Sequence, residues 1–209
     1  MAAPDPLYLL PTPAGAWIAS VEAAADRLRA FIRLLLAQPV SPPWRDPDDL
    51  FVRRLSQLGW VQFLTAPRRV SQTPFDDALR SYLPALSAKG SALLADAHGF
   101  HLASTGFSDS AAEALAALSA DLASLHDRHR RSLNQNLGLG GSAWAMPDAA
   151  GHSQLAFWPL HVGEHRFALV TAGVPHLNQP ELVDLVWLLH QRYGPLARPA
   201  QHGAETTTR

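Results

Sequence analysis

The stretch ALLADAHGFHLASTGF, from Ala92 to Phe107, joins two runs of apolar residues through a short polar turn. The first run ends at Asp96, and Gly99 closes the three-residue turn AHG. Two such runs, separated by three to five residues that include a glycine, predict a β-hairpin. The hairpin places a pair of antiparallel strands near the middle of the chain.

A long helix is predicted directly after this hairpin. The sequence SAAE, from Ser110 to Glu113, has the spacing of a capping box. One stripe then advances by three or four residues at a time through Leu115, Leu118, Leu122, Leu125, His129 and Leu133. A helix of that length would extend about 35 Å at 1.5 Å per residue. This is longer than one small sheet requires, and the sequence GLGG at 138–141 is expected to end it.

The remaining segments beyond residue 73 follow from the same patterns of apolar spacing and of turn residues. In the strand around Phe157, both sets of alternating residues are apolar, which predicts a sheet covered on both faces. The predicted segments are a helix from Thr73 that ends before Gly90, strands at 142–148, 153–162 and 166–173, and a helix from Pro180 to Tyr193.

The order helix, strand, strand, helix, three strands, helix resembles the roadblock/LC7 family, which includes dynein light chains and bacterial activators of small polarity GTPases. The resemblance covers residues 73–194. It implies an α/β (α+β) fold, a roadblock-like α-β-β-α-β-β-β-α sandwich with one antiparallel five-stranded sheet. The residues that carry it are the hairpin, the Leu/Ala-rich helix, AWAMPDAAGHSQLAFWPLHVGEHRFALV and NQPELVDLVWLLHQRYG.

The same resemblance implies a non-enzymatic interaction protein, a dimeric scaffold or regulator of a small GTPase or its assembly. Homodimerisation would use the long helix and the strand after GLGG. The sequence supports an interface there independently, because the leucine stripe exceeds one small sheet and aromatic and Met side chains, common at interfaces, follow it. The expected interface residues are Leu115, Leu118, Leu122, Leu125, His129, Trp144 and Met146.

Residues 1–66 are predicted to form a small separate unit of hairpin, helix, helix and strand, which is winged-helix-like. Its hairpin would bend at PTPAG (11–15), and its helices would span 22–38 and run from Asp46, as N-cap, to Leu58. The polar segment 65–74 is the expected boundary to the second domain. Residues 195–209 lack apolar periodicity and are expected to be a disordered tail.

The last helix of this unit presents Arg53, Arg54 and Gln57, which we expect to contact a protein partner. The alternative is a DNA-binding transcriptional regulator, in which the second domain dimerises or senses a ligand. Three aspartates between residues 46 and 49 oppose this alternative, because the N-terminus of a reading helix usually contacts the bases. Protein docking is therefore preferred to nucleic-acid binding.

The chain has ten histidines and no cysteine, so a histidine-based metalloprotein or enzyme is a third hypothesis. Zinc needs three or four ligands. His98 and His101 flank a turn, where residues three apart on a strand point to opposite faces. His126 and His129 share a helix face but lack the Glu of a zinc-protease motif. We therefore expect no metal, no cofactor and no catalytic residues.

Composition sets further bounds. Hydrophobic residues form 47% of the 209 residues, and the formal net charge of −1 predicts no general attraction to nucleic acid or to anionic lipid. No apolar run approaches the roughly 18 residues that span a bilayer. The N-terminus lacks the pattern of a signal peptide. A cytoplasmic protein without a membrane span is the resulting expectation.

Overall fold

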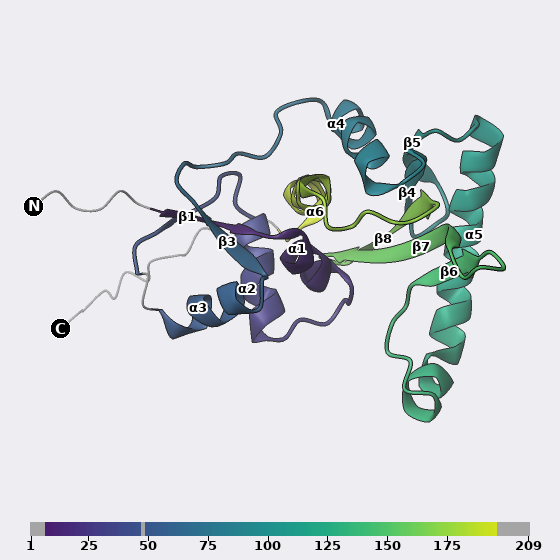
Figure 1. Ribbon diagram of the computed structural model, residues 1–209, viewed down its shortest axis with the longest axis horizontal. Helices are drawn as coiled ribbons and strands as arrows, with labels where there is room; N and C mark the ends of the chain where they lie inside the picture. Colours follow the sequence, from purple (N-terminus) through teal and green to yellow (C-terminus); the bar gives the residue numbers. More distant parts are fainter. Residues whose placement is uncertain (1–6, 47–48, 196–209) are drawn as a thin grey trace, which may run out of the picture.

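The computed structural model describes residues 7–46 and 49–195. Beyond residue 74 it contains a five-stranded antiparallel sheet of strand order β5-β4-β8-β7-β6, with helices on both faces, as Figure 1 shows. The roadblock-like element order predicted from the sequence is confirmed. The elements are α4 (Phe75–Tyr82), the 3₁₀ helix η1 (Leu83–Leu86), β4 (Ala92–Asp96), β5 (His101–Thr105), α5 (Asp109–Arg131), the π-helical turn η2 (Ser132–Asn136), β6 (Trp144–Pro147), β7 (Ser153–Val162), β8 (His165–Ala172) and α6 (Pro180–Tyr193).

The predicted β4–β5 hairpin is confirmed, and Asp96 organises its turn. One carboxylate oxygen of Asp96 accepts hydrogen bonds from the backbone N–H groups of His98 and Phe100, at 2.9 and 3.0 Å. Gly99 adopts a φ of 85°, a conformation that favours glycine. An aspartate that satisfies backbone groups a few residues later is a common way to hold such a turn.

Alternating residues of the central strands supply two hydrophobic layers. Leu93 and Val170 face α5, whereas Leu94 and Leu169 belong to the larger core on the opposite side. That larger core also contains buried residues of α1, α4 and α6. The sheet is therefore covered on both faces, as the apolar character of both sets of strand residues predicts.

Residues 7–64 form β1 (Leu7–Pro11), α1 (Pro13–Ser20), α2 (Arg27–Leu36), β2 (Pro43–Trp44), α3 (Leu50–Gln57) and β3 (Val61–Leu64), with the sheet order β2-β1-β3. The predicted N-terminal hairpin is wrong. The Thr12 hydroxyl accepts a hydrogen bond from the Gly15 N–H at 3.1 Å, and Pro13 is the first helical residue. The segment expected to be a second strand is consequently the helix α1, and β1 pairs with β2 and β3.

Four predicted helix starts also shift along the chain. The N-cap of α5 is Ser108, whose hydroxyl accepts a hydrogen bond from the Ala111 N–H at 3.3 Å, in place of Ser110. The N-cap of α3 is Asp49, which replaces Asp46 in that role. The N-cap of α4 is Pro74 instead of Thr73, and α2 begins at Arg27 instead of near residue 22. At α2, α3 and α5 the side chain of the capping residue, Asp26, Asp49 and Ser108 respectively, accepts a backbone N–H, whereas Pro74 makes no such hydrogen bond at α4.

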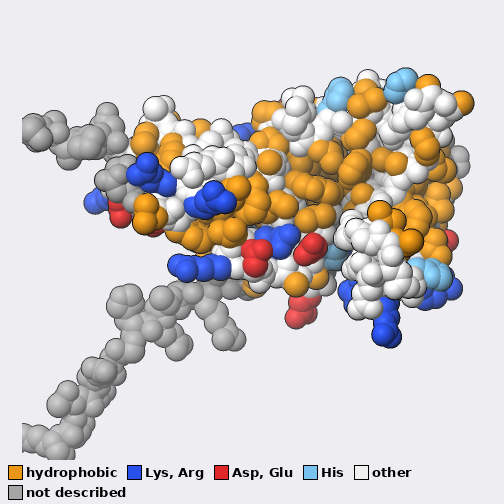
Figure 2. Space-filling model, turned by 60° about the horizontal axis from the view of Figure 1, so that its bottom comes forward, with side chains coloured by type: hydrophobic (Ala, Val, Ile, Leu, Met, Phe, Trp, Pro, Cys, Tyr) orange, Lys and Arg blue, Asp and Glu red, His pale blue; other side chains and the backbone are white. Residues whose placement is uncertain are grey.

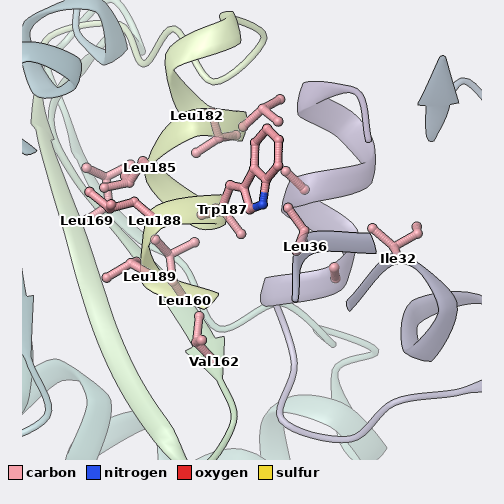
Figure 3. Packing of buried hydrophobic residues seen from close by; sticks show 14 of the residues in the cluster. Ile32, Leu36, Leu160, Val162, Leu169, Leu182, Leu185, Trp187, Leu188 and Leu189 are labelled. Atoms are coloured by element: carbon pink, nitrogen blue, oxygen red, sulfur yellow. The ribbon is translucent and has the colours of Figure 1, made fainter. Parts of the chain in front are cut away.

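The N-terminal segment shares its hydrophobic core with α6. Trp187 lies between α6 and α2 in Figure 3, and its indole N–H donates to the backbone carbonyl of Gln38 at 2.7 Å. The side-chain amide of Gln191 donates to the carbonyl of Leu36 at 2.8 Å. The separation of the chain into independently folding units at 1–66 and 73–194 remains a prediction. Apart from Pro195, the predicted tail lies outside the described residues.

Candidate functional site

The helix α5 lies on the sheet through small side chains. Ala112, Ala116 and Ser119 are buried on its inner face, and His126 is buried one to two turns further along. Small residues allow a helix to approach a sheet closely, and this contact fixes the rotation of α5 about its axis. The leucine stripe is therefore directed to a flank of the helix and not straight into the core.

The leucine flank lies on the side of α5 that faces β6 and β7. Leu115 and Leu122 are half-buried and pack in one cluster with Trp144 and Leu155. Leu118 lies further from the sheet, and 37% of its surface is exposed. Leu115 and Leu122 of the flank therefore complete the hydrophobic cluster on this face of the sheet, whereas Leu118 is partly exposed to solvent.

The strand β6 forms the edge of the sheet next to this flank. It pairs only with β7 among the described strands, with Trp144 opposite Phe157 and Met146 opposite Leu155. Met146 is on the face that α5 covers, yet 49% of its surface is exposed. An edge strand leaves backbone N–H and C=O groups available to another strand. The apolar flank and the open edge are therefore adjacent.

Trp144 connects the helix with this edge. Its indole packs edge-on against the buried ring of His126, with 6.4 Å between the ring centroids. The Trp144 Nε1 is buried and has no hydrogen-bond partner within the described residues. It lies beside a hollow of about 30 Å³ whose lining includes Ser119 and Ser142. A buried donor without an acceptor costs free energy, so the described residues leave this position not fully satisfied.

Three of the seven predicted interface residues, Leu115, Leu122 and Trp144, pack in this cluster, and Leu118 and Met146 are partly exposed beside it. The other two, Leu125 and His129, lie further along α5, where Leu125 is half-buried and His129 is exposed. Leu155, which is absent from the predicted set, belongs to the same cluster. Leu137 and Leu139, also absent from that set, are exposed just beyond α5. The alternation in β7 could have indicated Leu155, whereas nothing periodic marks the two exposed leucines.

Basic residues gather at the C-terminal end of α5. Arg128, Arg130 and Arg131 lie in its last turn, where the helix dipole favours cations. Figure 2 shows basic side chains around this projecting end of the molecule, at the lower right of the view. Asp127 is paired with Arg166 of β8 at 2.8 Å, which anchors this part of the helix to the sheet.

The three predicted docking residues, Arg53, Arg54 and Gln57, are exposed on α3, while Val52 and Leu55 of the same helix are buried. They are far from α5 along the chain and belong to the opposite end of the molecule in Figure 1. They therefore form a second surface and do not extend the leucine flank.

Asp49, one of the three aspartates that oppose DNA binding, is the N-cap of α3. One carboxylate oxygen of Asp49 accepts hydrogen bonds from the N–H groups of Phe51 and Val52, at 2.8 and 3.3 Å. A carboxylate therefore occupies the end of the helix that would approach the bases in a winged helix. The assignment of this unit as winged-helix-like remains a prediction.

The histidines are dispersed over the molecule. His98 and His101 are exposed on either side of the β4–β5 turn, and His126 is buried while His129 is exposed. In the described ranges, no three His, Asp or Glu side chains are placed so that they could share a metal ion. The histidines of these two pairs thus have different surroundings despite their similar spacing.

His190 is the most perturbed histidine that the structure places in the core. Only 3% of its surface is exposed, and neither ring nitrogen has a hydrogen-bond partner among the described residues. Burial, with a smaller contribution from the charge of Arg33, lowers the pKa of His190 from 6.5 to about 4. The residue lies on α6, away from the α5 flank, and its perturbed pKa concerns the stability of the core.

Among the described residues, no helix has the length and apolar character required to cross a bilayer. Comparison with protein-family models finds no match, and comparison with curated proteins finds none either.

Several solved structures are similar to the chain. A roadblock/LC7 domain from Streptomyces avermitilis is 21% identical over 56% of this chain and 95% of that chain, with a TM-score of 0.39. MglB of Myxococcus xanthus is 15% identical over 64% of this chain and 99% of its own, with a TM-score of 0.37. The gliding protein MglB from Thermus thermophilus is 20% identical over 56% and 84%, with a TM-score of 0.34.

The order of the elements from α4 to α6 and the five-stranded antiparallel sheet β5-β4-β8-β7-β6 are the arrangement that the sequence resemblance implies. The chain therefore contains a roadblock-like α/β domain.

Proposed function

We propose that the chain is a non-enzymatic interaction protein of the cytoplasm, which forms a homodimer through α5 and β6 and acts as a scaffold or regulator of a small GTPase or its assembly. The observation that carries the dimer is the apolar flank of α5 beside an open sheet edge, where Leu118 and Met146 are 37% and 49% exposed. Burying such side chains is the main source of free energy in stable association.

A second copy of the chain is a suitable partner for this surface, because in a two-fold symmetric dimer each copy contributes the same patch to the interface. Most soluble oligomers are symmetric homodimers with one self-complementary patch. An edge strand paired with its symmetry mate would continue the sheet and satisfy its backbone groups.

The dimer is tested by placing a charge on the flank. Leu118→Arg is expected to produce a monomer at concentrations where the unaltered chain is dimeric, because a guanidinium would have to be desolvated in the interface. Leu34→Arg is the matched control, since Leu34 is 62% exposed on α2, away from the flank. Sedimentation equilibrium of both variants measures the difference. Equal association of the two variants would contradict the interface.

The connection to small GTPases rests on the sequence resemblance. We place the second contact on α3, where Arg53, Arg54 and Gln57 are exposed. The test is titration of the full chain with purified small GTPases from the same source, loaded with GDP or with a GTP analogue, in calorimetry. Alanine at all three positions is expected to weaken any such complex without changing the homodimer. Absence of binding to every GTPase in both nucleotide states would refute this part of the proposal.

A further inference from the structure

We propose that the outer surface of α2 and α3 binds the face of an anionic lipid bilayer, with leucines that enter the lipid and arginines that contact its phosphate groups. This goes beyond the proposed function, because it assigns a membrane-surface contact to the segment before α4. We define the outer surface by the side chains of Arg27, Phe31 and Leu34 of α2 and of Leu50, Arg53 and Arg54 of α3.

Each of the two helices carries an exposed leucine on the side opposite to its buried residues. Leu34 of α2 is 62% exposed, and Leu50 of α3 is 79% exposed. With about 3.6 residues per turn, both leucines lie on the side of their helix that faces away from the core. The residues that each helix buries are Ile32, Leu35 and Leu36 in α2 and Val52 and Leu55 in α3.

The two helices meet along a seam of aromatic side chains. Phe31 packs edge-on against Phe51 of α3, with 5.2 Å between the ring centroids. The guanidinium carbon of Arg27 lies 5.0 Å from the centre of the Phe51 ring. Leu50 directly precedes Phe51, and Leu34 lies one helical turn beyond Phe31. The exposed sides of α2 and α3 therefore join into one surface.

Basic residues border both leucines. Arg53 and Arg54 are exposed and follow Leu50 by three and four residues, so their side chains are its neighbours on α3. Arg27 is exposed and lies seven residues before Leu34, which places both on the same side of α2. Figure 2 shows hydrophobic and basic side chains interspersed over this end of the molecule, on the left of the view.

The positive charge belongs to this end and not to the chain as a whole. Residues 27–58 contain six arginines and three aspartates, whereas the chain has a formal net charge of −1. Arg29 and Arg33 donate to backbone carbonyls between residues 18 and 23 and are turned away from the outer surface. Asp49 accepts hydrogen bonds from N–H groups of its own helix. A weakly acidic chain can therefore bind anionic lipid at one local surface.

An anionic bilayer offers complementary groups to both kinds of side chain. Phosphate oxygens accept the paired N–H groups of a guanidinium, and the hydrocarbon just below the headgroups takes up leucine side chains. A partner helix would need an apolar groove. Leu34 and Leu50 instead project from the outward sides of two helices, which suits the flat surface of a bilayer.

The bilayer would cover Arg53 and Arg54, to which we have assigned a contact with a protein partner. The two contacts would therefore exclude each other, and vesicles are expected to compete with any partner that binds α3. Vesicle binding is measured without a GTPase, and the dimer is measured without lipid. The three proposals can consequently fail independently.

Co-sedimentation of the full-length chain with lipid vesicles tests the surface. At low salt, vesicles of phosphatidylcholine with roughly one quarter phosphatidylserine are expected to bind at least about tenfold more tightly than vesicles of phosphatidylcholine alone. Added salt is expected to reduce this difference, because it screens the charges.

Two double variants separate the contributions of charge and of apolar contact. Arg53→Glu with Arg54→Glu is expected to weaken binding to the anionic vesicles at least about twentyfold, since each arginine near an anionic surface contributes about a factor of five. Leu34→Ser with Leu50→Ser is expected to weaken it at least about tenfold, because neither side chain would then enter the lipid. Urea denaturation of each variant checks that the fold is retained.

Matched controls carry the same changes at the other end of the molecule. Arg128→Glu with Arg130→Glu alters the net charge equally at the end of α5, and Leu137→Ser with Leu139→Ser removes two exposed leucines just beyond it. Both controls are expected to bind the anionic vesicles as the unaltered chain does.

Binding that is lost in both surface variants and kept in both controls would support the proposal. Absence of binding to anionic vesicles at low salt would refute it, as would an equal loss in the controls at α5. A loss in the arginine variant alone would refute the entry of the leucines into the lipid. If the surface variants bind vesicles normally but no longer bind a GTPase, the surface belongs to a protein partner and the lipid contact is refuted.

Discussion

Replacing the buried His190 with leucine is expected to remove a loss of stability that the unaltered chain suffers in weak acid. The imidazole projects from α6 and is buried in the interior of the protein. Neither ring nitrogen has a hydrogen-bond partner among the described residues. A leucine of similar size therefore gives up no hydrogen bond of the described structure. At pH 7 we expect the free energy of unfolding to change by less than about 1.5 kcal/mol, the usual limit for a volume-conserving exchange.

The magnitude follows from the pKa of His190. It is lowered from 6.5 to about 4 in the folded protein, and one pKa unit corresponds to about 1.4 kcal/mol. Between pH 6.5 and about pH 4, His190 binds a proton in the unfolded chain but not in the folded chain. The free energy of unfolding therefore falls as the pH falls through this range. Above about pH 6.5 His190 is neutral in both states, and the stability is at its full value. By pH 4.5 protonation of His190 in the unfolded chain lowers the free energy of unfolding by about 2.5 kcal/mol.

Urea denaturation of the unaltered chain and of His190→Leu at pH 7 and at pH 4.5 measures this effect. The difference between the two proteins is expected to shift by about 2.5 kcal/mol in favour of the variant on acidification. Identical pH dependence of the two proteins would refute the reasoning, because the perturbed histidine would then contribute nothing to acid sensitivity. The change is expected in the transition midpoint and not in the slope, since the surface exposed on unfolding is the same.

Three further predictions, which involve four substitutions, concern packing and helix capping, and each is tested by chemical denaturation. Trp187→Phe removes the indole N–H that donates to the carbonyl of Gln38, just beyond α2, and is expected to cost about 1–3 kcal/mol; a cost below about 0.5 kcal/mol would contradict a shared core. Ser108→Ala is expected to cost about 1 kcal/mol and Ser110→Ala much less, because Ser108 caps α5; the reverse order would assign the cap to Ser110. Gly15→Ala is expected to cost about 1–3 kcal/mol, because its methyl group would collide with the backbone carbonyl of Trp60; an unchanged stability would contradict that close approach.

Local patterns predicted the roadblock-like part of the fold well. The β4–β5 hairpin follows from Asp96 and Gly99, which a turn of this kind requires, and α5 follows from the spacing of its leucines. The prediction of an N-terminal hairpin was wrong because the same residues are compatible with two structures. Thr12 followed by Pro13 signals a turn between strands as well as the start of a helix, and only the distant strand β3, which pairs with β1, decides between them.

The candidate site was predictable only in outline. Periodicity placed the leucines of α5 on one stripe, but it could not show that the small residues Ala112 and Ala116 face the sheet. Because of them, the leucines lie on a flank that is only half-covered by Trp144 and Leu155. The shared core was not foreseeable either, since Trp187 and the carbonyl that it bonds are 149 residues apart. No local pattern encodes a contact over that distance.

The central claim is that α5 and β6 form the interface of a homodimer. Its most direct test is sedimentation equilibrium of the unaltered full-length chain over a range from low micromolar to high micromolar concentration. The account predicts a mass near twice that of the 22.6 kDa chain, with a single reversible dissociation constant. A mass that stays at 22.6 kDa across the whole range would contradict it.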